Sequence, residues 1–336
     1  MSYSLLHHNT FGVNAQCREF IEYNSVQELQ QDVLPRLADE RWLHIGAGSN
    51  LLFVGDFDGI ILHSAITGVE VVAEEDDSVL LKVGAGMPWD DFVAWAVNHD
   101  YYGIENLSYI PGEVGASAVQ SIGAYGVEVS QVIEYVEVVE VVTGRCLVLK
   151  PSELNYSYRY SMFKSEEAKG RYVVTHVCYR LSRCFHPDLT YAATRRALDS
   201  EGVIADRLTA QMLRGIIIKV RQSKLPEPSE LGSAGSFFMN PIVDCEVYKQ
   251  LAEQYPEMPH FVTDTGIKIP AGWLIEHCGW KGRRVGAVGV YDKQALVIVN
   301  YGGASGQDIA QVSHSIEQDV WTKFGIRIHP EVLFVS

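Results

Sequence analysis

The sequence predicts an α+β protein with more than one domain, and three observations lead to that fold class. Strand patterns with few helices fill the region from about 69 to 183, and the clearest helical pattern lies near the C-terminus. No regular alternation of strands and helices, the pattern of a parallel βαβ sheet, runs through the chain. The 336 residues also suit two or three domains, since domains commonly span about 100–200 residues.

The N-terminal part begins with a helix and short strands. Ser25 followed by Glu28 is a capping box, which predicts a helix to about Leu37. Residues 42–45 have the pattern of a short buried strand, and residues 51–63 are typical of strand, turn and strand. A second helix is predicted from Pro88 to about residue 98.

The middle of the chain predicts a hairpin, followed by a change in composition. β-branched residues fill 132–142, and 146–149 pairs back after a Thr-Gly turn. Another strand is expected at 171–181. An amphipathic helix then covers about 208–221, and the proline-containing segment 224–228 is typical of a linker or of the entry to a domain.

The C-terminal part predicts helices between short strands. A short helix is expected at 271–278 and a strand at 295–299. Ser305 caps the clearest helix of the chain and Gly325 ends it. The last segment, 326–335, is predicted as a strand.

Two glycine-rich stretches are candidates for backbone that contacts a ligand. Residues 110–126 contain four glycines and a Pro-Gly turn without any Lys or Arg. Successive exposed N–H groups can bind an anion without a cationic side chain, so this stretch is either a phosphate cradle or a run of tight turns. The other stretch, 46–50, lacks the third glycine of a dinucleotide fingerprint, because Leu51 occupies its place.

Composition argues against several classes of protein. The formal net charge of −15 argues against a general nucleic-acid binder, which needs a basic face to neutralise phosphates. The six cysteines form no CxxC pair and the eleven histidines no metal-ligand spacing, so we expect reduced thiols and no metal site. No apolar run approaches the ~18 residues of a membrane span, and the N-terminus has no leader pattern, so we expect a cytoplasmic protein.

Three polar residues in apolar or glycine-rich surroundings are candidates for chemistry. Arg159, among tyrosines, either grips a carboxylate or stacks on a ring as part of the structure. Ser236 follows Gly235 on a turn, where a serine is more often a cap than a catalyst, and no GxSxG motif supports a hydrolytic triad. Glu331, in the predicted last strand, is either solvated or a buried acid with a raised pKa.

Seven blocks of sequence, in order along nearly the whole chain, resemble one family of enzymes. They are IGAGSNLLF at 45–53, IPGEVGASAVQSIGAYGVE at 110–128, YSYRYSMFK at 156–164, SKLPEP at 223–228, GSAGSFFMNP at 232–241, AGWLIEHCGWKG at 271–282 and HPEVLF at 329–334. Together they resemble UDP-N-acetylenolpyruvoylglucosamine reductase, a flavoenzyme family of bacterial cell-wall precursor synthesis.

The resemblance implies non-covalent FAD in a two-subdomain FAD-binding fold of the vanillyl-alcohol oxidase/PCMH type. The flavin subdomains would be 1–68 and 69–205, and 206–336 would form a C-terminal α+β substrate-binding domain whose last strand returns to the flavin site. The implied FAD-binding residues share glycine-rich or adjacent backbone: Gly46, Gly48, Ser49, Asn50, Gly112, Gly115, Ser117, Gln120, Gly123, Tyr125 and, on a helix, Arg221.

The resemblance also implies the reaction. NADPH would reduce FAD, and hydride would then pass to the enolpyruvyl group of a UDP-sugar to give UDP-N-acetylmuramate. Arg159 and a protonated Glu331 would stabilise charge at the substrate carboxylate, and Ser236 would deliver a proton to carbon. The UDP-sugar would be held by Tyr191, Lys224, Asn240 and Gln294. We expect a monomer that binds no nucleic acid and does not insert into a membrane.

The sequence departs from many relatives at three positions. Val119 stands where they carry Pro, Ser121 where they carry Asn, and Leu333 where they carry Arg. The segment 189–191 resembles the tyrosine loop of one structural type of the family. Two alternatives stay open: another non-covalent FAD oxidase or dehydrogenase that acts on an alcohol or sugar, and a nucleotide-sugar binding protein without turnover.

Overall fold

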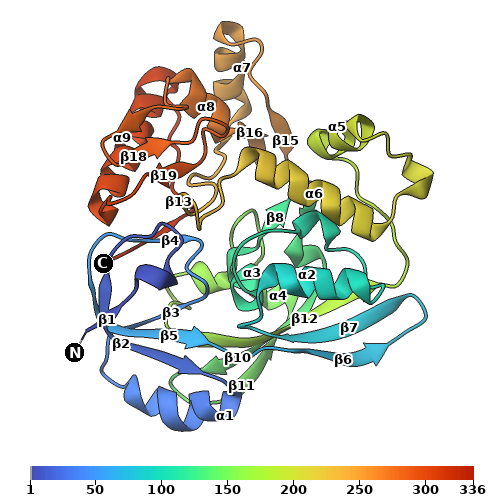
Figure 1. The fold of residues 1–336 in the computed structure, drawn as a ribbon, viewed down its shortest axis with the longest axis vertical. Helices are drawn as coiled ribbons and strands as arrows, with labels where there is room; N and C mark the ends of the chain where they lie inside the picture. The colour runs from blue at the N-terminus through green and yellow to red at the C-terminus, as the bar shows by residue number, and fades with distance from the viewer. Residues whose placement is uncertain (1) are drawn as a thin grey trace. The chain divides into compact units, whose positions relative to one another are not determined.

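The strands and helices belong to two units in a computed structural model that describes residues 2–336 (Figure 1). Unit 1 contains residues 2–3, 17–47 and 58–222, and unit 2 contains 4–16, 48–57 and 223–336. Two N-terminal segments therefore pack with the C-terminal third of the chain. The predicted boundaries after residues 68 and 205 stay predictions.

Two β-sheets account for most strands of unit 1. One sheet runs in the order β1-β2-β5-β3, with β3 and β5 parallel; its strands are β1 (Tyr3–Ser4), β2 (Gln16–Tyr23), β3 (Trp42–Ile45) and β5 (Phe57–Ser64). The other is antiparallel in the order β11-β10-β12-β7-β6, from β6 (Val69–Glu74), β7 (Ser78–Gly84), β10 (Ile133–Glu140), β11 (Cys146–Leu149) and β12 (Tyr172–Ser182). A small hairpin joins β8 (Gly123–Ala124) to β9 (Val127–Glu128).

Helices α2 and α3 lie against the antiparallel sheet of unit 1 (Figure 1). The unit's helices are α1 (Val26–Glu28) with further helical turns to Arg36, α2 (Trp89–Asn98), α3 (Val114–Gln120), α4 (Pro151–Leu154), α5 (Ala192–Ser200) and α6 (Ala210–Lys224), which ends in unit 2. Phe92 and Val93 of α2 pack with Val79 and Leu81 of β7 in one buried cluster. Fully burying such a side chain stabilises the fold by about 1.5–3 kcal/mol.

Unit 2 also combines short sheets with helices. One antiparallel sheet runs β13-β19-β18-β17, from β13 (Gly232–Ser233), β17 (Arg284–Val285), β18 (Val288–Val290) and β19 (Ile298–Asn300). A second sheet runs β14-β16-β15, from β14 (Ile242–Val243), β15 (Phe261–Thr263) and β16 (Gly266–Lys268). Separately, β4 (Leu51–Phe53) pairs in parallel with β20 (Leu333–Val335). The helices are α7 (Cys245–Gln254), α8 (Ala271–His277) and α9 (Gly306–Phe324).

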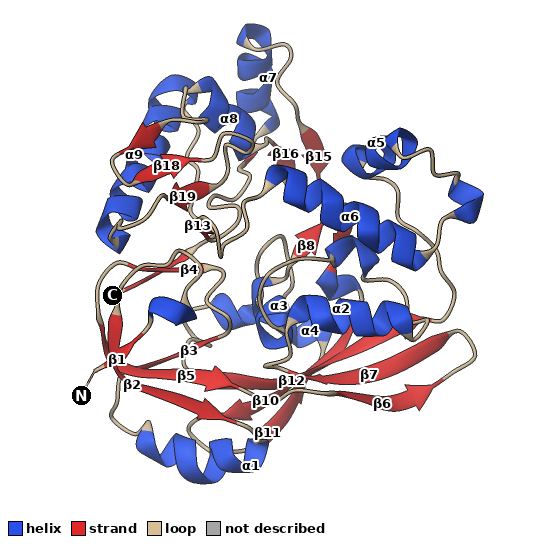
Figure 2. Ribbon diagram, viewed as in Figure 1, coloured by secondary structure: helices blue, strands red, loops and turns tan. Residues whose placement is uncertain are grey.

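The predicted α+β class is confirmed, since each unit contains both helices and mainly antiparallel sheets (Figure 2). The helix starting at Ser25 is confirmed, with the Ser25 hydroxyl accepting a hydrogen bond from the N–H of Glu28 (3.0 Å). The predicted strands and hairpin of unit 1 are confirmed within a few residues. Helix α9 begins after Ser305 and ends at Gly325, whose φ is 64°.

Three predicted elements of unit 2 need correction. The final strand covers only β20, so Glu331 precedes it; Ile326 and Ile328 are buried in the core instead of pairing within the predicted strand. The strand predicted at 295–299 begins only at Ile298, because a turn bonds the N–H of Val297 to the carbonyl of Gln294 (3.1 Å). Lys224 is the last residue of α6, not part of a linker.

Candidate active site

Ser236 and Glu331 lie on two segments of unit 2 that backbone hydrogen bonds hold side by side. The N–H of Glu331 donates to the carbonyl oxygen of Phe237 (2.8 Å), and the N–H of Met239 donates to that of His329 (3.0 Å). Phe237 is fully buried, while the preceding Ser236 is exposed. The buried ring therefore fixes the turn and leaves the serine hydroxyl accessible.

The loop Gly48-Ser49-Asn50 of unit 2 meets the segment that carries Glu331. The side-chain amide of Asn50 donates to the carbonyl oxygen of Glu331 (3.3 Å), and the N–H of Leu333 donates to the carbonyl of Asn50 (3.0 Å). Gly48 has a φ of 67°, and a Cβ there would lie 2.0 Å from the carbonyl oxygen of His8. Only glycine fits this position, and it lets the loop turn beside Glu331.

In unit 1, the stretch 110–126 contains the helix α3, which the sequence pattern did not predict. The N–H of Gly115 donates to the carbonyl oxygen of Ala85 (2.8 Å), and a Cβ at Gly115 would lie 2.9 Å from the Cβ of Ala85. The Ser117 hydroxyl donates to the carbonyl of Val114 (2.7 Å) and bonds the Tyr179 hydroxyl (2.9 Å). The Ser117 hydroxyl is therefore bonded to groups of the protein core, and its proposed contact with FAD stays a prediction.

Arg159 holds the turn after α3. Its guanidinium donates to the carbonyl oxygens of Ser121 (3.3 Å) and Gly123 (2.5 Å) and lies 5.1 Å from the centre of the Tyr158 ring. Nearby, the ammonium of Lys164 donates to the side-chain oxygen of Gln120 (3.1 Å). The sequence left open whether Arg159 grips a ligand or stacks on a tyrosine, and the structure shows it beside a ring and bonded to the loop.

Ser121 is the most unusual residue of this turn. It is fully buried, it ends α3 in the left-handed conformation (φ 48°, ψ 60°), and its hydroxyl has no hydrogen-bond partner among the described residues. An unpaired buried hydroxyl costs about 1–3 kcal/mol, which a bound ligand can recover. This orphaned hydroxyl fits a ligand that brings a polar atom to the turn after α3.

Tyr125, Tyr191 and Arg221 gather at another point of unit 1. The two tyrosine rings meet edge to face, with centroids 5.4 Å apart and planes at 90°. Burial raises the pKa of Tyr125, and loss of hydration lowers the pKa of Arg221, whose side chain also donates to the carbonyl of Tyr109 (2.9 Å). The structure therefore places three predicted site residues close together: Tyr125 and Arg221, predicted to contact the cofactor, and Tyr191, predicted to contact the substrate.

Asn240 and Gln294 both have side-chain oxygens near the first residues of α8 in unit 2. The side-chain oxygen of Asn240 accepts a hydrogen bond from the N–H of Ala271 (2.9 Å). The side-chain oxygen of Gln294 would lie 3.2 Å from a Cβ on Gly272 and accepts a bond from the N–H of Leu296 (3.3 Å). The start of α8 therefore orients the Asn240 amide, the turn before β19 orients the Gln294 amide, and Lys224 lies at the end of α6.

Three further residues of unit 1 form a cluster that the sequence did not single out. His63 on β5 bonds the carboxylates of both Glu22 and Glu113 (2.9 Å each). The one signal in the sequence was Glu113, an acid placed directly after Pro111-Gly112 in a stretch without a basic residue. Its partner His63 could not be found by spacing, since the fold alone brings the two segments together.

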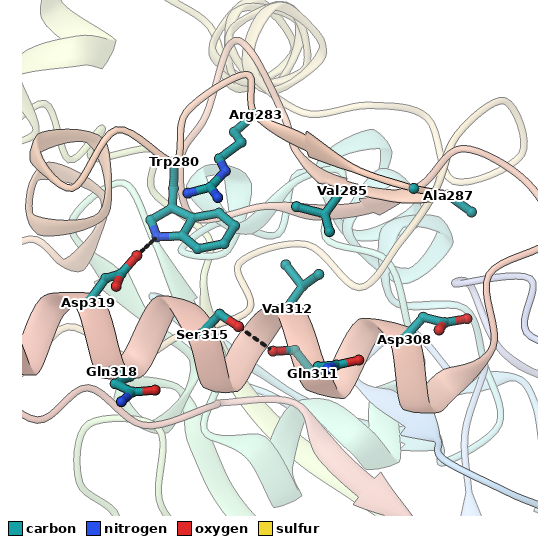
Figure 3. Close-up of a pocket in the computed structure, with 11 residues that line it drawn as sticks. Trp280, Arg283, Val285, Ala287, Asp308, Gln311, Val312, Ser315, Gln318 and Asp319 are labelled. Carbon is teal, nitrogen blue, oxygen red and sulfur yellow. Dashed lines mark hydrogen bonds between the residues drawn. The ribbon is translucent and has the colours of Figure 1, made fainter.

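A cavity of about 600 Å³ in unit 2 lies between α9 and the β17–β18 hairpin (Figure 3). The indole of Trp280 donates to the carboxylate of Asp319 (2.9 Å), and the Arg283 guanidinium lies 4.2 Å from the centre of the Trp280 ring. The predicted substrate residues do not line it. Over residues 2–336, no cluster of three or more His, Cys, Asp or Glu side chains could hold a metal ion, and no helix is long and apolar enough to cross a bilayer.

Residues 23–150 match the family described as FAD binding domain, so this α+β protein is a flavoprotein. Residues 227–335 match the C-terminal domain of UDP-N-acetylenolpyruvoylglucosamine reductase. The chain belongs to the UDP-N-acetylenolpyruvoylglucosamine reductase family.

Relatives named UDP-N-acetylenolpyruvoylglucosamine reductase match nearly the whole chain. The protein of Bacteroides fragilis (strain YCH46) is 52% identical over 335 residues, 99% of each chain. That of Porphyromonas gingivalis (strain ATCC 33277) is 48% identical over 99% of this chain and 98% of its own. The crystal structure of UDP-N-acetylenolpyruvylglucosamine reductase (MurB) from Thermus caldophilus has the same fold, with a TM-score of 0.69 at 21% identity over both full chains.

Proposed function

We propose that this protein reduces UDP-N-acetylglucosamine enolpyruvate to UDP-N-acetylmuramate with NADPH and FAD, a step of peptidoglycan precursor synthesis. The observation that carries the proposal is the full-length identity of 48–52% to reductases of that name. These relatives lend no support to an alcohol or sugar oxidase, nor to a binding protein without turnover. Neither of the two alternatives that the sequence left open is therefore favoured.

The cofactor would lie against the glycine backbone. FAD, when bound, supplies hydride transfer between NADPH and the substrate. Main-chain N–H groups suit its diphosphate, and the buried Ser121 hydroxyl offers an unpaired polar group. The proposed holding residues are those expected from the sequence: Gly46, Gly48, Ser49, Asn50, Gly112, Gly115, Ser117, Gln120, Gly123, Tyr125 and Arg221.

Arg159, Ser236 and Glu331 are the proposed catalytic set. When hydride is added to the enolpyruvyl group, negative charge grows on the carbon beside the carboxylate. Arg159 would bind this carboxylate, and Glu331 would donate a hydrogen bond to it in its protonated form, so both interactions strengthen as charge develops. Ser236, exposed on its turn, would give the proton to that carbon.

The nucleotide-sugar would be held by Tyr191, Lys224, Asn240 and Gln294. The amide of Asn240 is oriented by the start of α8 and that of Gln294 by the N–H of Leu296, which suits hydrogen bonds to uracil or sugar. Lys224 would pair with phosphate as a point charge. Tyr191 is 42% exposed and has its ring against Tyr125, an arrangement that supports the tyrosine-loop type.

The setting in the cell belongs to the same proposal. We expect a cytoplasmic monomer without a nucleic-acid partner, since the chain carries a formal net charge of −15 and its substrate is a small nucleotide-sugar. The division into flavin subdomains 1–68 and 69–205 and a substrate domain 206–336 is part of the proposal.

An absorbance assay of NADPH oxidation with the enolpyruvyl UDP-sugar tests the activity. Purified protein should be yellow from FAD and should consume NADPH only when the enolpyruvyl compound is present. A UDP-sugar without the enolpyruvyl group is the control substrate. Protein that takes up no FAD, or that oxidises NADPH equally with the control substrate, would contradict the proposed function.

A further inference from the structure

His63 lies between two carboxylates, one at each nitrogen of its ring. Nδ1 is 2.9 Å from a carboxylate oxygen of Glu22 on β2, and Nε2 is 2.9 Å from a carboxylate oxygen of Glu113. Of the three side chains, Glu113 is the most buried, with 11% of its surface exposed against 18% for His63 and 52% for Glu22. The contact with Glu113 is therefore the one better shielded from water.

A charged imidazole fits this contact when both carboxylates are ionised. Ionised carboxylates only accept hydrogen bonds, so both ring nitrogens of His63 must donate, and a neutral imidazole has only one N–H. The Glu113 hydrogen bond is the largest cause that raises the pKa of His63, and Glu22 adds to it. Imidazolium between the two acids leaves the cluster with one net negative charge.

The other charged and titratable groups around His63 support this state. His44 on β3 has its pKa lowered to about 4 by burial and by the charge of His63, so it stays neutral. It bonds the hydroxyl of Tyr23 on β2 (2.8 Å), and burial raises the pKa of that phenol, which keeps it protonated as well. The ring of Phe20 lies 6.1 Å from that of His63. Glu22 and Glu113 are thus the charged partners of His63.

Glu113 lies beside the glycine loop 46–50. A Cβ added to Gly46 would lie 3.0 Å from its second carboxylate oxygen, so this oxygen faces the first glycine of the loop 46–50. Glu113 also directly precedes α3, between the glycines 112 and 115. If this backbone receives the diphosphate of FAD, an uncompensated carboxylate beside it would repel the cofactor.

We propose that His63 is a positioning residue for FAD: its imidazolium neutralises and orients Glu113, which allows an acidic side chain to form the wall of a diphosphate-binding loop. The inference rests on the proposed function, because it needs FAD at the loops around Gly46 and Gly112. When His63 loses its proton, the hydrogen bond to one carboxylate is lost and Glu113 becomes an unbalanced charge. FAD affinity therefore falls as the pH rises through the raised pKa of His63.

The test is the dissociation constant of FAD as a function of pH, measured by flavin fluorescence on release from and return to the purified holoprotein. We expect the dissociation constant to increase about tenfold between pH 6 and pH 9, the scale of one added unit charge near a diphosphate. Thermal unfolding at each pH is recorded in parallel. It separates loss of cofactor from loss of fold.

Variants distinguish positioning from a merely structural contact. Glu113→Gln should bind FAD with an affinity that no longer changes between these pH values. His63→Gln should bind weakly at both, and the double variant should recover the affinity of Glu113→Gln. His176→Gln is the matched control, because His176 has the same 18% side-chain exposure and pairs with Glu137 (3.2 Å) on the antiparallel sheet of the same unit. It should keep the wild-type pH profile.

Two results would overturn the inference. One is a wild-type dissociation constant that is equal at pH 6 and pH 9; the other is a Glu113→Gln variant that keeps the wild-type slope. Neither of these two results contradicts the proposed reductase activity. Protein that takes up no FAD at any pH contradicts the proposed function itself.

Discussion

The backbone N–H of Glu331 donates a hydrogen bond of 2.8 Å to the carbonyl oxygen of Phe237, the residue directly after Ser236. The bond joins main-chain atoms, so it survives replacement of either side chain. Substitutions at 236 and 331 therefore change the chemistry offered at these positions while the two segments stay paired.

Ser236→Ala should separate the two halves of the reaction. If the serine hydroxyl donates the final proton, reduction of the flavin by NADPH stays near wild type, while reoxidation by the enolpyruvyl substrate slows by about 10²–10⁴-fold. Stopped-flow absorbance measures both steps. Ser229→Ala, at another serine of unit 2 outside the proposed catalytic set, is the control and should change neither. Equal losses in both steps for Ser236→Ala would contradict proton donation.

Glu331 is tested by comparing two replacements. An amide can still donate a hydrogen bond, whereas a methyl group cannot, so Glu331→Gln should reoxidise the flavin faster than Glu331→Ala. Single-turnover reoxidation rates give the comparison. If the two variants react at the same rate, hydrogen-bond donation is not the role of this side chain.

Gly48→Ala should destabilise the protein by more than about 2 kcal/mol, because alanine must adopt a left-handed conformation and its Cβ meets the carbonyl of His8. Gly55→Ala is the matched control in the turn after β4, since nothing lies within 4 Å of a Cβ there. It should change the free energy of unfolding by about 0.5 kcal/mol or less. Urea denaturation of the two variants measures the difference, and similar losses would refute the steric account.

His44 should make the fold sensitive to acid. Its pKa is about 4 in the folded chain, below the ordinary value, so the unfolded chain binds the proton more readily. Above the pKa that His44 has in the unfolded chain, the imidazole is neutral in both states. As the pH falls from there toward 4, only the unfolded chain takes up the proton, so the folded chain loses stability. Between pH 7 and pH 5 the loss amounts to roughly 1–2 kcal/mol.

The measurement is urea unfolding of wild type and His44→Gln at both pH values. The variant should lose less stability on acidification than the wild type does. His314→Gln, at an exposed histidine of α9, should behave like the wild type. An equal loss in His44→Gln and wild type would show that another group causes the acid sensitivity.

Elements with strong local signals could be predicted from the sequence. Helix α9 is an example, since Ser305, Gly325 and the apolar face at Ile309 and Ile316 all point to the same helix. Helix α3 was hidden because VGASAVQ is made of small residues without a clear apolar period, and its packing on Ala85 depends on a distant strand. The early end of the final strand likewise results from tertiary packing of Ile326 and Ile328.

For the candidate site, residue identities came from a resemblance spread over seven blocks, and no spacing rule joined them. The structure adds the pairing of the Ser236 turn with the Glu331 segment and the pairing of Tyr125 with Tyr191. It also adds the His63 cluster, which depends on β2 and β5 lying beside each other. Side-chain partners of this kind are set by long-range packing, which local patterns do not encode.

The parallel pairing of β4 with β20 matters for how the protein is made. Leu51 to Phe53 pair with Leu333 to Val335, so β4 cannot complete this pair until residues 333–335 have left the ribosome. Until release, the apolar strand β4 lacks its partner edge and can pair wrongly or bind a chaperone. A chain truncated before residue 333 would leave β4 without this partner permanently, so we expect a poor yield of folded protein.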